Sequence, residues 1–472
     1  MTRGTLRSES FGEGEKFTST AGNVRIRDTI TESPVLSGTT DPESRRLMKT
    51  LAASLLTVAV LTASACSSDT TEPESTPSTS TEAAQPEYVA ELQSTVEQLM
   101  RDNAIPGAVV QISSPDRGDW TGTFGTSTID ADDPISADDH FRIGSNTKTM
   151  TVTAVLQLVE EGRLSLDDPI SKYIDGVPNG DTITIAQLAE MRSGLYSYTF
   201  DPEFNATLDR EPEKAWTQEE LLQIAFSHPV NFAPGEQFEY SNTNTVLLGL
   251  VIEELTGMPV AEVFDERIFV PLGLENTSFP AIDDASIPDP HPQGYMFGTN
   301  VSTIDTSALP EDEQAAAVAG TLKPNDMTDA NPSWGWTAGA AISTADDLTA
   351  YVKALVGGGL LDEQMQQTRL DSVQPVGGGT AGYGLGMAQF GPLLGHDGQL
   401  PGFMTFMGHD PETDLTIVIA TNLSTVPSGE GSALTLVKGI LPIFYGSSYQ
   451  PPGDPARAPG AEESTPAPTP GG

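Results

Sequence analysis

Strand patterns stand at both ends of one long patterned stretch, with helical patterns between them, and this placement constrains the fold most. Near the start, 108–113 and 120–126 alternate as two strands around a turn. Near the end, strands are expected at 385–390, 393–396, 403–408 and 415–421. The sequence therefore predicts an α/β fold in which an antiparallel sheet, built from both termini and flanked by helices, carries an inserted and mainly helical subdomain.

Helical periodicity fills the rest of the stretch. The predicted helices cover 87–102, 145–162, 185–191, 217–226, 245–256, 260–268, 345–356 and 432–444. Together, these patterns define one domain at 87–447. A Ser/Thr/Pro-rich linker at 66–86 precedes it and a disordered tail at 448–472 follows it, because neither composition can bury a core.

An export signal is expected before the linker. Arg45, Arg46 and Lys49 form a basic region, and an apolar run at 51–63 is too short to span a bilayer. Small residues link this run to Cys66, the single cysteine of the chain, which indicates a lipidated N-terminus and anchoring to the outer face of the cell membrane. Cleavage after Ala65 would instead give a freely secreted protein.

Residues 1–65 are thus interpreted as an upstream segment with a signal peptide. Because the signal lies far from Met1, Met48 is a candidate for the true start of translation. A rival interpretation includes residues 44–46 in a twin-arginine signal.

Composition excludes several functions. Acidic residues number 66 against 23 basic ones, a formal net charge of −43, so nucleic acid and anionic lipid would be repelled. Membrane contact is expected only through a lipid anchor. A lone cysteine gives no disulfide framework, and no metal-binding motif or G-x-S-x-G elbow is found. We therefore expect no metal and no cofactor.

Ser145 and Lys148 have the Ser-x-x-Lys spacing at the start of a predicted helix. Positions i and i+3 share one helical face, so a neutral lysine could take the proton of the serine hydroxyl. Alone, the motif is better explained as a helix cap followed by a solvated lysine.

Two further motifs favour the interpretation of Ser145 and Lys148 as a nucleophile and its base. Tyr240 and Asn242 follow a turn and offer a phenol for proton transfer and an amide for a substrate carbonyl. His396 stands between two glycines on a predicted edge strand, where a substrate can approach the backbone. The alternatives are a capping turn for the first motif and a simple turn for the second.

Ser-x-x-Lys, Tyr-x-Asn and His-x-Gly in this order resemble the serine D-alanyl-D-alanine carboxypeptidases and class C β-lactamases. The segments FRIGSNTKTMTVTAVLQLVEEGRLSLDDPI, ITIAQLAEMRSGLYSY, FEYSNTNTVLLGLVIEELTG and SWGWTAGAAISTADDL also look like family segments, so the resemblance spans about 87–446. It implies a β-lactamase/DD-peptidase-like fold.

The resemblance also implies roles. Ser145 would form an acyl-enzyme, Lys148 would accept its proton, and Tyr240 would be the partner acid and base. Asn242 would contact the acyl side, and His396 would add polarity near Tyr240 and the leaving group.

Further substrate-binding positions follow from the same resemblance. The backbone N–H groups of Ser145 and Gln399 would form the oxyanion hole, next to Gly398. Trp334 would wall the cleft, although a core tryptophan explains it equally well. Asp397 would lie near the leaving group.

Two departures bear on the substrate. The third motif reads His-Asp-Gly-Gln where the carboxypeptidases have His-Thr-Gly-Thr, so Asp397 places a negative charge near the substrate carboxylate. The arginine that the family offers to that carboxylate is missing, since Met387, Ala388 and Gln389 follow Gly386. An ester, an amide or a D-amino-acid substrate with a free amine would fit better.

The sequence thus predicts an exported, monomeric serine hydrolase that acts on an amide or ester through an acyl-enzyme. Its partners would be a small molecule or peptide, such as a peptidoglycan stem peptide or a β-lactam. The alternatives are a non-catalytic cell-wall or β-lactam-binding surface lipoprotein, a purely structural lipoprotein and, among enzymes, an esterase or D-aminopeptidase.

Overall fold

The computed structural model describes residues 85–376, 380–447 and 449. The expected signal peptide, the lipidation at Cys66, nearly all of the 66–86 linker and nearly all of the 448–472 tail lie outside the described residues. Of the helices in the described part of the chain, none combines the length and apolar character needed to cross a membrane.

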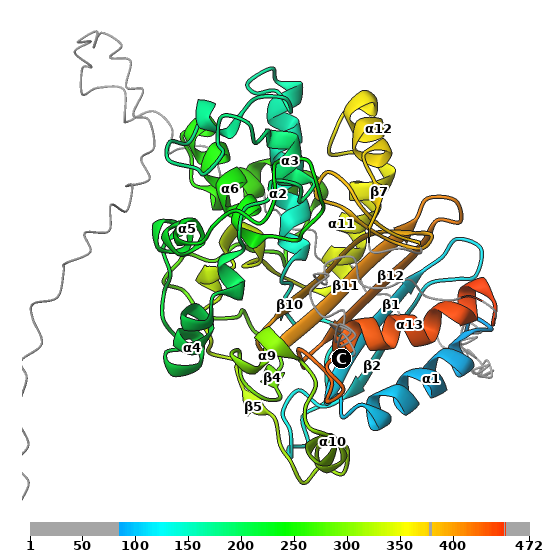
Figure 1. The fold of residues 1–472 in the computed structure, drawn as a ribbon. Helices are drawn as coiled ribbons and strands as arrows, with labels where there is room; N and C mark the ends of the chain where they lie inside the picture. The colour runs from blue at the N-terminus through cyan, green and yellow to red at the C-terminus, as the bar shows by residue number, and fades with distance from the viewer. Residues whose placement is uncertain (1–84, 377–379, 448, 450–472) are drawn as a thin grey trace, which may run out of the picture. The chain divides into compact units, whose positions relative to one another are not determined.

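The domain contains one large antiparallel sheet with the strand order β2-β1-β12-β11-β10-β9-β8-β7 (Figure 1). Its strands are β1 Gly107–Ser113, β2 Trp120–Gly125, β7 Gln374–Pro375, β8 Ala381–Tyr383, β9 Ala388–Phe390, β10 Leu393–Leu400, β11 Phe403–Asp410 and β12 Leu415–Thr421. β1 pairs with β12 from Ala108 opposite Thr421 to Ser113 opposite Thr416. This pairing confirms the prediction of one sheet built from both ends of the chain.

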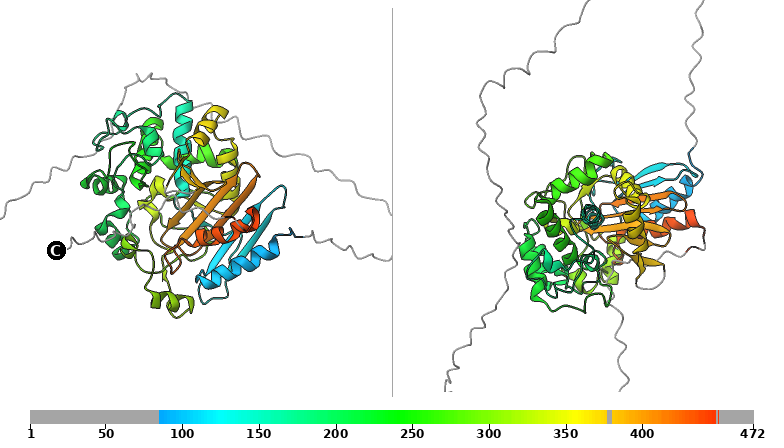
Figure 2. Two further views of the ribbon diagram at one scale, coloured as in Figure 1. Left: turned by 45° about the vertical axis from the view of Figure 1, so that its right-hand side comes forward. Right: turned by 90° about the horizontal axis from the view of Figure 1, so that it is seen from above.

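Helices cover both faces of the sheet. α1 Val89–Asp102 and α13 Ser432–Tyr445 lie side by side on one face, and α11 Ala345–Gly357 packs on the other (Figures 1 and 2). Side chains of β1 and β12 alternate between the two cores: Val110 and Ile419 face α1 and α13, whereas Val109 and Val418 face the larger core. A strand buried on both faces follows this period of two.

The helical subdomain lies between β2 and β7 in the sequence. It includes α2 Asn146–Glu160, α3 Ile185–Ala189, α4 Pro202–Arg210, α5 Gln218–Ser227, α6 Asn242–Thr256, α7 Val260–Phe264, α8 Val270–Leu272, α9 Ser302–Asp305, α10 Glu311–Val318 and α12 Glu363–Asp371. The short pairs β3 Phe141–Arg142 with β6 Ile342–Ser343 and β4 Tyr295–Met296 with β5 Asn325–Asp326 tie its loops together. α2 and α6 pack against each other in its core.

Several sequence predictions need correction: the strand expected at 403–408 continues to Asp410, and the helix expected at 245–256 begins at Asn242. The strand expected at 385–390 covers only Ala388–Phe390, because Gly386 has a positive φ of 63° and turns the chain first. The strand expected at 393–396 continues to Leu400. β10 is also not simply an edge strand: β9 pairs with Leu393–Gly395, and only the half from His396 onward presents an edge.

Candidate active site

Ser145 stands at the N-terminus of α2, on a turn held by the sheet. The hydroxyl of Thr405 on β11 donates to the Ile143 carbonyl (3.0 Å), and the Asn146 amide donates to both Thr405 Oγ1 (2.6 Å) and that carbonyl (3.0 Å). Just before this turn, the buried Arg142 guanidinium donates to the carbonyls of residues 285, 328 and 330. The backbone around Ser145 is therefore held in place by hydrogen bonds to β11 and by the hydrogen bonds of Arg142 to neighbouring loops.

Lys148 lies one turn further along α2 and is fully buried. Its Nζ is 2.9 Å from Ser145 Oγ, 2.6 Å from Asn242 Oδ1 and 2.7 Å from the Ala338 carbonyl oxygen. The side chain of Ser145 makes no capping bond to the helix. The alternative of a helix cap followed by a solvated lysine is therefore wrong.

The three contacts of Lys148 suit both protonation states of its amine, because an ammonium group can donate to all three oxygens. The Asn242 amide nitrogen donates to Thr199 Oγ1 (3.1 Å), so its oxygen faces the lysine. That oxygen and the Ala338 carbonyl can only accept, so the two N–H groups of a neutral amine serve both. In the neutral state, the remaining lone pair faces the hydroxyl of Ser145, which can then donate to Lys148 Nζ across the 2.9 Å between them.

Electrostatics favours the same state. Burial lowers the pKa of Lys148 well below its usual 10.5, and the negative charge of Asp397 opposes this with a smaller effect. Because the folded-state pKa is depressed, the neutral form of Lys148 is reached at a lower pH than in a solvated lysine. The hydroxyl of Ser145 thus lies 2.9 Å from an amine that reaches its neutral form below the pH range in which lysine normally loses its proton.

Tyr240 lies beside the lysine on the side of β10. Its ring centroid is 4.8 Å from Lys148 Nζ, and its ring also packs edge-on against Tyr383 at 6.1 Å. Asn242 begins α6 two residues later, and its backbone N–H donates to Ser197 Oγ (3.1 Å). Tyr240, Asn242, Ser145 and Lys148, identified from two separate motifs, are thus brought together.

His396 lies behind Tyr240 and is completely buried. Its Nδ1 donates to the Asp397 carbonyl (2.5 Å), so Nε2 accepts from the Tyr383 hydroxyl (3.2 Å). Burial, with a smaller contribution from Lys148, lowers the pKa of His396 to about 3. The ring of His396 lies 6.1 Å from that of Tyr240, close to that residue as expected, but His396 is not among the described residues that line either cleft, so it supports Tyr240 and does not face the leaving group.

Two glycines bring the backbone of β10 against the serine turn. Gly144 has a φ of 53°, and a Cβ there would lie 2.5 Å from the Gln399 nitrogen. A Cβ on Gly398 would lie 1.9 Å from the Ile143 oxygen and 2.8 Å from the Ser145 nitrogen. The backbone N–H groups of Ser145 and Gln399 therefore lie close together where β10 contacts the serine turn, which is the arrangement expected of an oxyanion hole.

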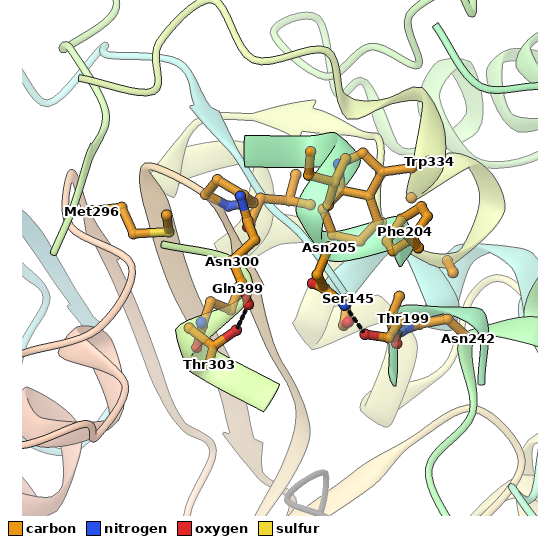
Figure 3. Close-up of a pocket in the computed structure, with 16 residues that line it drawn as sticks. Ser145, Thr199, Phe204, Asn205, Asn242, Met296, Asn300, Thr303, Trp334 and Gln399 are labelled. Carbon is orange, nitrogen blue, oxygen red and sulfur yellow. Dashed lines mark hydrogen bonds between the residues drawn. The ribbon is translucent and has the colours of Figure 1, made fainter. Parts of the chain in front are cut away.

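Ser145 and Gln399 lie where two clefts meet. The first, about 700 Å³, has an aromatic and aliphatic wall of Phe204, Leu208 and Trp334 and a polar wall that includes the amides of Asn205, Asn242 and Asn300 (Figure 3). Trp334 packs edge-on against Phe204 at 6.0 Å, so it both walls the cleft and contacts the core. No carboxylate is among the described residues that line this cleft.

The second cleft, about 770 Å³, lies on the side of Tyr240. Besides Ser145 and Gln399, its charged and polar lining includes Tyr240, Asp397, Thr425, Glu430 and Lys438. Sequence reasoning missed Glu430 and Lys438, as well as Thr199 and Tyr383, because none of them belongs to a motif. Within the described chain, no group of three or more His, Cys, Asp or Glu side chains is placed to hold a metal ion.

Comparisons with known proteins agree with this geometry. A family profile described as Beta-lactamase matches residues 92–439. Protein flp of Staphylococcus aureus (strain MW2) is 30% identical over 194 residues, which cover 40% of this chain and 38% of that protein. The match thus spans less than half the length of that relative.

Solved structures match over nearly their whole length. A D-stereospecific amidohydrolase from Streptomyces sp. has a TM-score of 0.61 and 30% identity over 73% of this chain and 97% of its own. The D-amino acid amidase from Ochrobactrum anthropi SV3 has a TM-score of 0.62 and 25% identity over 75% and 98%. The predicted fold and the resemblance are confirmed, and the chain belongs to the beta-lactamase family, whose members are serine hydrolases.

Proposed function

We propose that this protein hydrolyses amides or esters of D-configured acyl groups through an acyl-enzyme on Ser145. The observation that carries the proposal is the contact set of Lys148, whose amine faces the serine hydroxyl while two acceptors occupy its other side. The names of the two solved relatives, a D-stereospecific amidohydrolase and a D-amino acid amidase, support the choice of the D configuration.

The first half-reaction begins when Ser145 Oγ attacks the substrate carbonyl and Lys148 takes the hydroxyl proton. The backbone N–H groups of Ser145 and Gln399 stabilise the oxyanion of the tetrahedral intermediate. Tyr240 then delivers a proton to the leaving nitrogen or oxygen as its bond to the carbonyl carbon breaks. In the second half-reaction, a water molecule replaces the leaving group and the same groups act in reverse to release the acid.

The first cleft suits the acyl part of the substrate. Asn242, which holds Lys148, borders this cleft, and the wall of Phe204, Leu208 and Trp334 favours an apolar side chain. The amides of Asn205 and Asn300 add hydrogen-bonding groups without charge. An uncharged acyl group with an aromatic or aliphatic side chain therefore fits best.

Stereoselectivity tests the proposal. N-acetyl-D-phenylalaninamide should be hydrolysed with a kcat/KM about 100-fold or more above that of its L enantiomer, because only one configuration places both the side chain and the carbonyl correctly. Ser145→Ala should remove the activity. Equal turnover of the two enantiomers, or undiminished turnover by Ser145→Ala, would refute the proposal.

A further inference from the structure

Under the proposed function, on which this inference rests, the leaving group would depart through the second cleft. The proton that completes bond cleavage must come from a group facing the leaving atom. Tyr240 lines the second cleft and not the first, whereas Asn242 lines the first and not the second. The bond to be cut therefore points from Ser145 towards Tyr240 and Asp397.

Charge in this cleft is unbalanced towards the negative. The side chains of Asp397 and Glu430 supply two carboxylates, and Lys438 is the one lysine or arginine among the described residues that line it. Lys438 Nζ forms an ion pair and a hydrogen bond with Glu430 Oε1, and the Thr435 hydroxyl donates to Glu430 Oε2 (3.3 Å). Glu430 therefore already pairs with Lys438, the cation that a substrate carboxylate could bind in this cleft.

We propose that the second cleft selects against leaving groups that carry a carboxylate and selects for uncharged or cationic amines, with Asp397 and the Glu430–Lys438 pair as its specificity determinants. An anionic leaving group would be repelled by Asp397. It would gain no attraction from Lys438, because Glu430 already neutralises the charge of that lysine. A cationic amine would be attracted by Asp397, and an uncharged amine would be neither favoured nor repelled.

Three substrates that share one acyl group test this inference. N-acetyl-D-phenylalanine is coupled through an amide to ethylenediamine, to propylamine or to glycine, which gives a cationic, an uncharged and an anionic leaving group of similar size. The wild-type kcat/KM should be highest for the ethylenediamine amide. It should be lower for the glycine amide than for the propylamine amide by about tenfold or more.

Single substitutions show which side chains of the second cleft produce the preference for the charge of the leaving group. Glu430→Gln releases Lys438 and should raise the glycine-to-propylamine ratio of kcat/KM by about tenfold, whereas Asp397→Asn should lower the ethylenediamine-to-propylamine ratio. Lys438→Gln leaves Glu430 without its cation and should deepen the discrimination against glycine. Glu97→Gln on α1, whose side chain is 56% exposed, is the matched control and should leave all ratios unchanged.

An activated ester distinguishes a failure of the proposed function from a failure of the proposal about the second cleft. The 4-nitrophenyl ester of N-acetyl-D-phenylalanine needs no protonation of its leaving group and reports only on Ser145 acylation and deacylation. If the wild-type protein does not hydrolyse it, the proposed function is wrong. If it is hydrolysed while the three amides show no ranking by charge, or while Glu430→Gln and Lys438→Gln leave the glycine ratio unchanged, the inference about the second cleft is wrong.

Discussion

Lys148→Met is expected to lower kcat/KM for N-acetyl-D-phenylalaninamide by about 10⁴-fold, the upper range for loss of a general base. The physical reason is that methionine fills the space of the lysine but cannot accept the proton of Ser145. Initial rates with the purified variant, at enzyme concentrations raised to allow for the loss, measure this effect.

Two further variants test whether the activity lost in Lys148→Met is due to loss of the lone pair of the lysine amine. Lys148→Arg places a permanent cation beside Ser145, but guanidinium stays protonated and cannot act as a base, so this variant should be inactive as well. Lys172→Met removes an exposed lysine paired with Asp168 and should retain wild-type activity. Substantial activity in Lys148→Arg would mean that positive charge, not proton transfer, is what Lys148 supplies.

Gly144→Ala is expected to lower kcat by about 10² to 10³-fold, the loss that follows removal of one oxyanion-hole donor. A methyl group at this position would lie 2.5 Å from the Gln399 nitrogen and 2.7 Å from the Gly398 carbonyl carbon. These are backbone atoms, so β10 and the serine turn must move apart. The two N–H groups would then no longer meet at one oxyanion.

Gly162→Ala is the matched control. Gly162 follows α2 and has a φ of 69°, similar to the 53° of Gly144, but no atom lies within 4 Å of a Cβ added there. The strain of a non-glycine residue at positive φ, about 1 kcal/mol, is therefore common to both variants. Thermal unfolding should shift in both, and kcat should fall only in Gly144→Ala. A loss of kcat in Gly162→Ala of the same size would show that strain alone explains the effect.

The sheet and its long helices could be predicted because their apolar residues follow periods of two and 3.6. The pattern at 108–113 and 415–421 gives the strands, and their pairing follows from joining both ends in one sheet. β7 and β8 were missed because strands of two and three residues carry no measurable period. α4 and α12 were missed since each buries only two or three side chains.

The proposed reacting groups could be named from the sequence because their chemistry restricts the residue types and the spacing. Ser145, Lys148, Tyr240 and Asn242 each belong to a short motif, and the structure brings them together. The supports of these groups carry no such signal. The Ala338 carbonyl is a backbone atom that any residue could supply, and Tyr383 reaches His396 from a different strand.

The orientation of His396 could not be deduced from the sequence either. Whether a given side chain of β10 faces the cleft or the sheet interior depends on the register with β11 and on the turn at residue 386. Both are properties of the folded chain, so the sequence predicts that His396 lies near Tyr240 but does not show that it lies outside both clefts.

The central claim is that Ser145 is the nucleophile and that neutral Lys148 takes its proton. A fluorophosphonate probe, followed by peptide mass spectrometry across a pH series, measures both the labelled residue and the rate of labelling. The claim predicts an adduct on Ser145 whose rate of formation rises with pH and levels off well below 10.5, the usual pKa of lysine. An adduct on another residue, or a rate on Ser145 that still climbs through 10.5 as a solvated lysine would dictate, would contradict it.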